Sequence, residues 1–275
     1  VAEATTKRKG GPTDGEVVEI FGPNIGGGDD HGGALAPTDA RLLLLPVRSL
    51  QGIFVWATCP FILKRLIRDL EFARKGTQLT VPTIDVGDGK AKVGTKTKLQ
   101  NDPLVLEDEE FDVGANGKSV DVDTLSTKLQ SLFPQIGAYK DFRARLGEYL
   151  VVISDTDFRR LVEPGTGTEV VTRIKLNKRK TTTGGGGNMW IEEFLPSDCL
   201  FYSLLLAMPS RHKTPTLTSG QAVLDLIRSK VLGCVTVNEK QVTDQIIQIG
   251  GDETVGRGWM RVHWFNGTPV TGGTI

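Results

Sequence analysis

Four glycines fall within nine residues near the end of the chain, where Gly250–Gly258 separates the strand-like runs 246–249 and 259–262. Glycine permits a positive φ and the close approach of backbone to a ligand. Successive exposed N–H groups can then cradle a phosphate, and a guanidinium matches phosphate geometry. The segment therefore predicts a strand–loop–strand unit that binds phosphate groups through Gly250, Gly251, Gly256, Arg257 and Gly258.

Two other interpretations of this loop stay open. Gly251 to Gly256 fits the G-x-x-x-x-G of a nucleotide-binding P-loop, but Arg257 and Gly258 stand where that motif has Lys and Ser or Thr. The acidic residues at 252 and 253 also argue against a P-loop, because they would put two negative charges where a triphosphate would lie. The last interpretation is a glycine-rich connection between strands that binds no ligand. An isolated glycine motif often occurs without a ligand.

The distribution of charge favours a polyanionic partner more than the net charge does. The chain has 275 residues and a formal net charge of zero, so its overall charge does not indicate a nucleic-acid binder. Basic residues cluster at 7–9, 90–98 and 173–180, and an acidic run occupies 107–112. Any one cluster is typical of solvated surface. Three basic clusters in loop-like or hairpin-like segments favour a polyanion.

Cysteine usage predicts a reducing compartment. Cys59, Cys199 and Cys234 are odd in number and lack metal-binding spacing. No secretory signal and no apolar run long enough to span a membrane are visible in the sequence. We therefore predict a cytoplasmic protein with no membrane partner. The chain begins at Val1 without Met, so we expect residues to be missing upstream.

Hydrophobic periodicity predicts an α+β fold with a mainly antiparallel sheet. Residues 1–37 form a polar, glycine-rich segment with no predicted element. Strands are expected at 38–45, ended by Pro46, and at 53–58, 104–106, 148–154 and 200–208. Helices are expected from Pro60, over 125–133, 139–146 and 155–162, and after Ser219. We expect residues 1–275 to form a single domain with two excursions, an insertion near 77–118 and a hairpin at 168–195.

The hairpin at 168–195 has two different sides. Val170, Thr172 and Ile174 alternate with Val171 and Arg173, so one side of the outgoing strand is apolar and the other basic. The tip carries Lys178, Arg179 and Lys180 and then a run of glycines. Such a hairpin could project and grip RNA. The alternative is a surface hairpin that packs against its own domain.

Several motifs occur in one order along the chain: His31–Leu35, Thr38–Arg41 with Pro46–Ser49, Asn188–Pro196 and Gly250–Gly258. Together they resemble the backbone-subunit family of the type III-B CRISPR effector, the Cmr complex, within the RAMP superfamily. The resemblance runs from about Phe21 to Val262.

This resemblance implies an RRM-like (ferredoxin-like) palm, a lid insertion about 77–118 and a thumb β-hairpin about 168–195. Copies would stack head to tail along a CRISPR RNA, and each thumb would reach across the guide–target duplex and flip out a base at regular intervals. The family cuts the target there with a divalent metal ion, Mg²⁺ or Mn²⁺. The implied partners are CRISPR RNA, single-stranded target RNA, further copies of the chain and other Cmr subunits.

The same resemblance implies RNA contacts for His31, for the tip residues Lys178, Arg179 and Lys180, and for the glycine loop. The alternative for His31 is that it is a turn residue in a glycine-rich loop and does not contact RNA. Trp190 is expected to pack within the hairpin, although RNA modules also stack bases on aromatic rings.

The expected catalytic residues are incomplete. Glu192 and Glu193 lie in the thumb-base motif and could orient water or metal as auxiliary catalytic groups. The alternative is that they are solvated or paired with thumb arginines. The central aspartate of the family lies in an N-terminal loop that maps to no position here, because Asp14, Asp29 and Asp30 do not stand in its motif. A scaffold that binds guide and target without cutting is therefore the alternative to an endoribonuclease.

Overall fold

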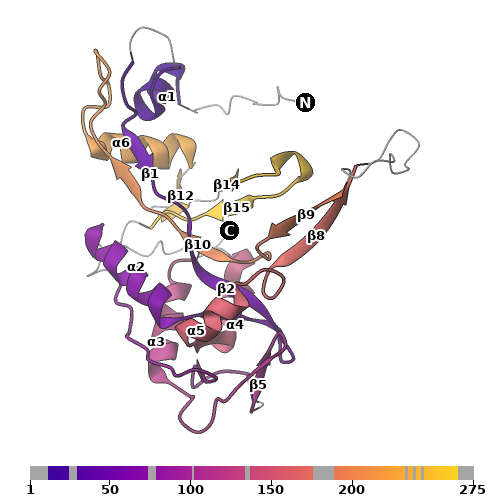
Figure 1. The fold of residues 1–275 in the computed structure, drawn as a ribbon. Coiled ribbons are helices and arrows are strands. Elements are labelled where there is room, and N and C mark those ends of the chain that lie inside the picture. Colours follow the sequence, from indigo (N-terminus) through magenta and orange to yellow (C-terminus); the bar gives the residue numbers. More distant parts are fainter. Residues whose placement is uncertain are drawn as a thin grey trace. The chain divides into compact units, whose positions relative to one another are not determined.

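The computed structural model describes residues 12–24, 30–73, 79–100, 102–133, 137–175, 189–232, 235–237, 240–242 and 245–265 (Figure 1). The chain divides into two compact units. The first, called here the sheet unit, consists of Arg41–Gln130 and Asp141–Tyr202. The second, the terminal unit, consists of Val1–Ala40, Ser131–Lys140 and Ser203–Ile275. Each unit is described by itself.

The sheet unit contains a seven-stranded mixed sheet in the order β4-β7-β3-β2-β5-β6, with β10 also paired to β2. Strands β3 and β7 are parallel, and the other pairs are antiparallel. The predicted combination of helices with a mainly antiparallel sheet is therefore confirmed. The bounds are β2 Arg41–Ser49, β3 Ile53–Thr58, β4 Ala91–Val93, β5 Leu104–Leu106, β6 Glu109–Phe111, β7 Leu150–Ile153 and β10 Leu200–Tyr202.

The middle of this sheet is buried on both faces. Residues 43–47 of β2, residues 55–58 of β3 and all of β7 are buried. Strands covered on both sides carry continuous apolar runs without alternation, which explains the four consecutive leucines at 42–45. Full burial of one such side chain contributes about 1.5–3 kcal/mol, so these strands form the core of the unit.

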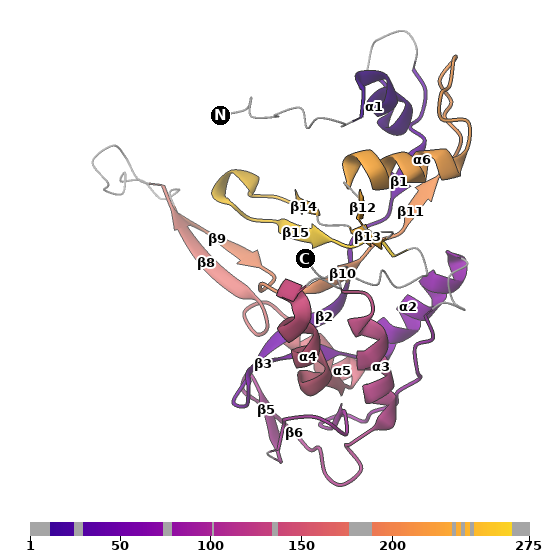
Figure 2. The same ribbon diagram turned by 180° about the vertical axis from the view of Figure 1, so that it is seen from behind.

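Four helices belong mainly to the sheet unit, as Figure 2 shows from behind: α2 Pro60–Phe72, α3 Val120–Gln130, α4 Lys140–Tyr149 and α5 Asp155–Leu161. The predicted start of α2 at Pro60 is confirmed. Proline suits the first helical turn, where no N–H donor is needed. Its apolar stripe, Leu63, Leu66 and Leu70, is buried. The predicted helix after Ser154 is confirmed as α5, whose Ser154 side chain accepts the Asp157 N–H at 3.0 Å.

The prediction that Pro46 ends its strand is wrong, because β2 continues to Ser49. Pro46 is in register with Trp56 of β3. On the other side of β2, the registered residues nearest to Pro46 are Leu44, opposite β10, and Ser49, opposite β5. Pro46 thus has a strand partner on one side only, where the missing N–H of proline is tolerated.

The predicted strand 200–208 is wrong as one element. It forms β10 against β2 and a separate β11 (Leu205–Ala207) against β1 (Leu35–Pro37). Between them, Ser203 Oγ donates to the Thr38 carbonyl at 2.7 Å, and Thr38 Oγ1 accepts the Leu204 N–H at 2.9 Å. These hydroxyl groups satisfy backbone groups where the strand is interrupted.

Segment 77–118 contains the strands β4, β5 and β6, whereas the sequence predicts only the strand 104–106 in this segment. The predicted strand 104–106 is confirmed as β5, which pairs with β6 at one edge of the sheet. Strand β4 pairs with β7 at the other edge. Part of the predicted insertion therefore belongs to the main sheet.

The described residues of the terminal unit form three antiparallel strand pairs, β1–β11, β12–β13 and β14–β15. The remaining bounds are α1 Asp14–Phe21, η1 Gly137–Tyr139, α6 Gly220–Leu226, η2 Ile227–Val231, β12 Val235–Val237, β13 Lys240–Val242, β14 Gln245–Gln248, η3 Glu253–Val255 and β15 Trp259–Val262. No helix among the described residues of the whole chain is long and apolar enough to cross a membrane.

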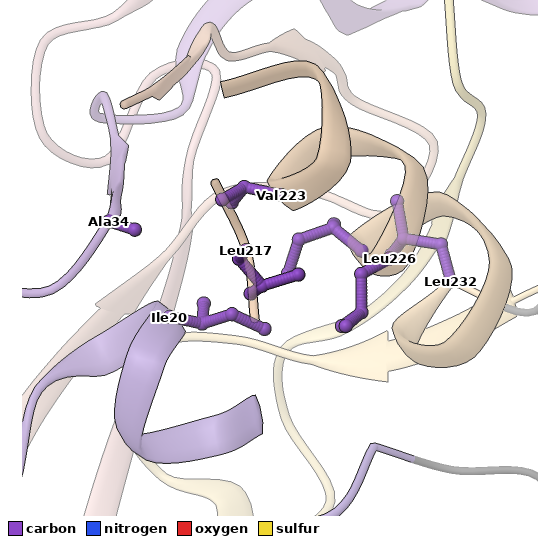
Figure 3. Packing of buried hydrophobic residues seen from close by; sticks show 7 residues of the cluster. Ile20, Ala34, Leu217, Val223, Leu226 and Leu232 are labelled. Atoms are coloured by element: carbon purple, nitrogen blue, oxygen red, sulfur yellow. The ribbon is translucent and has the colours of Figure 1, made fainter. Parts of the chain in front are cut away.

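Helix α1 lies in a segment for which the sequence predicts no element. Its start is a capping box, in which Thr13 Oγ1 accepts the Glu16 N–H at 3.3 Å and Glu16 Oε2 accepts the Thr13 N–H at 2.7 Å. The spacing Thr13-x-x-Glu16 is the signal that would have predicted this helix. Figure 3 shows Ile20 of α1 packed with Leu217, Val223 and Leu226 in a buried cluster.

Glu19 anchors α1 to the chain before α6. Its buried carboxylate accepts bonds from the backbone N–H of Thr216 and of Leu217, both at 3.0 Å, and from Thr216 Oγ1 at 2.6 Å. Burial acts to raise the pKa of Glu19, but the hydrogen bonds outweigh it and lower the pKa from 4.5 to about 2. The carboxylate therefore stays charged inside the unit.

We predict that Glu19→Gln destabilises the protein by about 1–3 kcal/mol, because the amide has one acceptor oxygen and turns an NH₂ group toward donors. Urea unfolding at pH 7 measures this loss. Since the folded pKa lies below the unfolded value, the stabilisation by Glu19 is complete above about pH 4.5 and is lost as pH falls toward 2. The variant should lack this part of the pH dependence.

The matched control is Asp14→Asn, an exposed acidic residue on the same helix. It should change stability by less than about 0.5 kcal/mol. Equal stability of Glu19→Gln and wild type at pH 7 would contradict the anchoring role.

Candidate nucleic-acid interface

The glycine loop is an ordered turn between β14 and β15, as predicted from its flanking apolar runs. Positive φ angles occur at Gly250 (99°), Asp252 (59°), Gly256 (83°) and Gly258 (77°). A P-loop leads from a strand into a helix, whereas this loop leads into an antiparallel strand. The structure therefore disfavours the nucleotide-binding interpretation.

Internal hydrogen bonds fix the second half of the loop. The backbone N–H of Gly256 donates to the Glu253 carbonyl at 3.0 Å, and that of Arg257 to the Asp252 carbonyl at 3.3 Å. The Gln248 amide donates to the carbonyls of Glu253 and Arg257, both at 2.8 Å. The N–H groups of Gly256 and Arg257 are thus used within the loop, and a ligand would approach its first half.

The glycines of this loop are needed for different reasons. A side chain at Gly258 would collide with the carbonyl of Ile249, and Gly250 and Gly256 adopt positive φ. Gly251 has neither constraint: no positive φ is recorded, and nothing lies within 4 Å of the position a Cβ would occupy. The conformation of the loop therefore does not explain why residue 251 is glycine.

Trp259 follows the loop directly and is 63% exposed. It is in register with Gln248, whose amide supports the loop. The sequence analysis did not select this residue. An aromatic immediately after a glycine-rich loop is the signal that would have found it.

The predicted hairpin is confirmed as the pair β8 (Glu169–Ile174) and β9 (Met189–Phe194), called here the arm. Residues directly opposite each other share a face. One face carries Val170, Ile174, Met189 and Ile191, and all four are exposed. The predicted tip residues Lys178, Arg179 and Lys180 lie outside the described residues.

Glu192 and Glu193 lie on opposite faces of the arm, because successive side chains in a strand alternate. Glu192 accepts a bond from Arg173 Nε at 2.7 Å and from the Trp190 indole at 2.6 Å. Glu193 accepts the Thr168 hydroxyl at 2.6 Å. The structure does not bring the two carboxylates together, and Glu192 has the arginine partner that the alternative interpretation describes.

His31 lies in the terminal unit, just before β1. Its Nδ1 is 3.2 Å from the Gly32 carbonyl oxygen, and its ring meets that of His212 edge to face at 5.5 Å. Its Nε2 is buried without a partner among the described residues. The ring is therefore oriented by contacts within its own unit, and its contact with RNA stays a prediction.

The RAMP superfamily matches residues 2–261. A relative from Pyrococcus furiosus, the CRISPR system Cmr endoribonuclease Cmr4, is 31% identical over 248 residues, covering 90% of this chain and 74% of the relative. The chain belongs to the RAMP superfamily, in its Cmr4 family.

Solved structures agree with this assignment. The crystal structure of oligomeric Cmr4 from Pyrococcus furiosus is 26% identical, with a TM-score of 0.62, covering 91% of this chain and 78% of that one. A type III-B Cmr-beta structure bound to cognate target RNA gives 16% identity and a TM-score of 0.55, covering 91% of this chain and 76% of its own. The second match supports the fold alone.

The Cmr4 relative is named an endoribonuclease, and the family resemblance implies Mg²⁺ or Mn²⁺ as its metal ion. Among the described residues, no group of three or more His, Cys, Asp or Glu side chains could hold a metal ion. Burial raises the pKa of the Cys59 and Cys199 thiols to about 12, which disfavours the thiolate form. The described residues therefore supply no cluster of ligands for a metal ion.

We predict that Glu192→Gln loosens the arm. The substitution removes the charge that Arg173 faces, at a partly exposed site where such a pair contributes about 1 kcal/mol or less. Hydrogen exchange of the β8 and β9 amides should therefore accelerate up to about fivefold. Glu193→Gln is the matched control, because its amide oxygen can still accept the Thr168 hydroxyl. Equal acceleration in both variants would contradict the role of Arg173.

Proposed function

We propose that this chain is a backbone subunit of a type III-B CRISPR effector that holds a CRISPR RNA and a single-stranded target RNA. Further copies of the chain and other Cmr subunits would be its protein partners. Membership of the Cmr4 family over residues 2–261 supports this proposal. We also propose that 1–275 acts as one RRM-like domain, in which 77–118 is the lid and 168–195, containing the arm, is the thumb.

The observation that carries the proposed function is the open backbone at Gly251. A subunit that accepts any guide sequence must hold phosphates and sugars, because contacts to base edges would select particular sequences. Base pairing then reads the target. Backbone approach at Gly251, on a loop fixed by Gln248, supplies a contact of that kind.

Target cleavage is the second part of the proposal. In an endoribonuclease role, the chain would act with Mg²⁺ or Mn²⁺, with Glu192 or Glu193 as auxiliary groups. The engagement of Glu192 by Arg173 and Trp190 favours instead a scaffold that binds both strands without cutting. RNA binding is common to both roles and is tested first.

We predict that Gly251→Leu weakens RNA binding without unfolding the protein. The φ of residue 251 allows a side chain and no atom lies within 4 Å, but the side chain would block backbone approach. Loss of one backbone contact corresponds to about 1 kcal/mol, or about a fivefold weaker affinity for single-stranded RNA in filter binding.

The control is Gly258→Ala, in which the new methyl group meets the Ile249 carbonyl and φ is 77°. This variant should lower thermal stability as well as RNA binding. If Gly251→Leu bound RNA as wild type does, phosphate contact through Gly251 would be excluded.

The test of the whole function is assembly with a CRISPR RNA and a matched target, followed by nuclease footprinting of both strands. Periodic protection is expected, with exposed nucleotides at the spacing of the thumbs. Alanine at Lys178, Arg179 and Lys180 should weaken that protection. Uniform or absent protection with wild type would refute the backbone role.

A further inference from the structure

The indole of Trp259 has no contact that explains why residue 259 is a tryptophan. The chain has four tryptophans. Trp56 is buried, and the Trp190 indole donates to Glu192. Trp264 packs against the buried cluster of the terminal unit. Trp259 is 63% exposed, and within the part of the chain that the structure describes its indole makes no ring contact and no hydrogen bond.

Trp259 lies on the outward face of the β14–β15 hairpin. Side chains alternate along β15, so Trp259 and Arg261 share one face, and Met260 and Val262 share the other. Val262 packs against the buried cluster of the terminal unit. On the face of Trp259, Ile246 is in register with Arg261 and is 51% exposed. This face is therefore turned away from the core of its unit.

The glycine loop leans over the same face. Gln248 is in register with Trp259, so the two side chains share a face and their Cβ atoms are about 4.5–5.5 Å apart. The Gln248 amide donates to the Glu253 and Arg257 carbonyls of the loop, which Figure 1 shows at the end of the β14–β15 ribbon. Gly251 is three residues beyond Gln248, at most about 11 Å along the chain. The indole and the open backbone at Gly251 are thus within the reach of one or two nucleotides.

The chemistry of this face fits a nucleotide. Bases of single-stranded nucleic acids stack on aromatic side chains, and every base has a π-face, so such a contact tolerates any sequence. Two residues further along the face, the Arg261 guanidinium lies over the Tyr139 ring at 4.9 Å and adds a fixed positive charge. A purely apolar protein partner would use neither this charge nor the backbone at Gly251. An exposed indole between a cation and an open backbone favours RNA.

We propose that Trp259 stacks an unpaired nucleobase of an RNA strand whose phosphate contacts the backbone at Gly251. The proposal rests on the proposed function, because it names the ligand class that the surroundings of the glycine loop take. A base inside a duplex is covered on both faces by its stacked neighbours, so the ligand is a single-stranded or unstacked nucleotide. Stacking holds that nucleotide without reading its base edge.

Removal of the base from the ligand tests the stacking directly. Filter binding compares short oligoadenylate and oligouridylate strands with an abasic ribose-phosphate oligomer of the same length. Trp259→Ala should weaken binding of both intact strands by about 5-fold to 100-fold. The same variant should bind the abasic oligomer as wild type does. Gly251→Leu should weaken binding of all three ligands, because the phosphates are present in each.

Two further substitutions separate an aromatic contact from an apolar one. Trp259→Phe keeps a ring that can stack and should retain most of the affinity, whereas Trp259→Leu should bind as weakly as Trp259→Ala. The unfolding midpoints of these variants should equal that of wild type, because residue 259 is exposed. Phe21→Ala is the matched control, since Phe21 is an aromatic residue of the same unit that is 57% exposed on α1. It should bind RNA as wild type does.

Three outcomes would overturn the stacking site. The first is equal weakening of the intact and abasic ligands by Trp259→Ala, and the second is full binding by Trp259→Leu. The third is wild-type RNA affinity of Trp259→Ala together with failure of that variant to join the assembled Cmr complex. The third outcome would assign the indole to a protein partner.

Footprinting of the assembled complex distinguishes this proposal from the proposed function. Periodic protection with wild type, combined with undiminished RNA binding of Trp259→Ala, would support the backbone role and overturn the stacking site. A loss confined to the intact strands, combined with uniform protection, would support the stacking site and refute the backbone role. A wild-type chain that binds neither the intact strands nor the abasic oligomer would overturn both.

Discussion

The buried indole of Trp56 joins the parts of the sheet unit on which the arm depends. Its ring packs edge to face against Phe54 of β3 at 4.9 Å and Phe142 of α4 at 4.7 Å. Its Nε1 donates to the Asp198 carbonyl at 3.1 Å, between β9 and β10. Because Trp56 is fully buried, its N–H requires such a partner. One side chain thus ties the central sheet to helix α4 and to the segment between β9 and β10.

The local sequence pattern was sufficient to predict the hairpin and the glycine loop, which form the candidate interface. The alternation in 170–174 predicts β8, and the glycine spacing at 250–258 predicts a strand connection; both signals lie within a few residues. The break between β10 and β11 could not be predicted in that way, because it depends on Thr38, far away in the sequence. The same holds for Pro46, which a strand interior tolerates only because β10 and β5 leave its other side without a registered partner.

The alternation of side chains along a strand, which puts Glu192 and Glu193 on opposite faces, was not used in the sequence analysis, where both were expected to be auxiliary catalytic groups. The partner of Glu192 was not predictable, because a shift of one residue in the pairing of β8 and β9 would have turned Arg173 to the other face. The Glu192 carboxylate is oriented by its bonds from Arg173 on β8 and from the Trp190 indole on β9, and the Arg173 bond links the two strands of the arm.

Gly251 and Ile53 are two residues whose identity the packing of their own unit does not explain. At Gly251 a side chain is absent although the fold has room for one, and at Ile53 a branched side chain is present although the backbone disfavours it. Neither choice improves the packing of the unit to which it belongs. Both lie on rigid supports, Gln248 beneath the loop and Arg145 behind the turn between β2 and β3. A rigid support lowers the entropy that binding must overcome, and this is the physical basis for the proposal that an RNA phosphate contacts the backbone at Gly251.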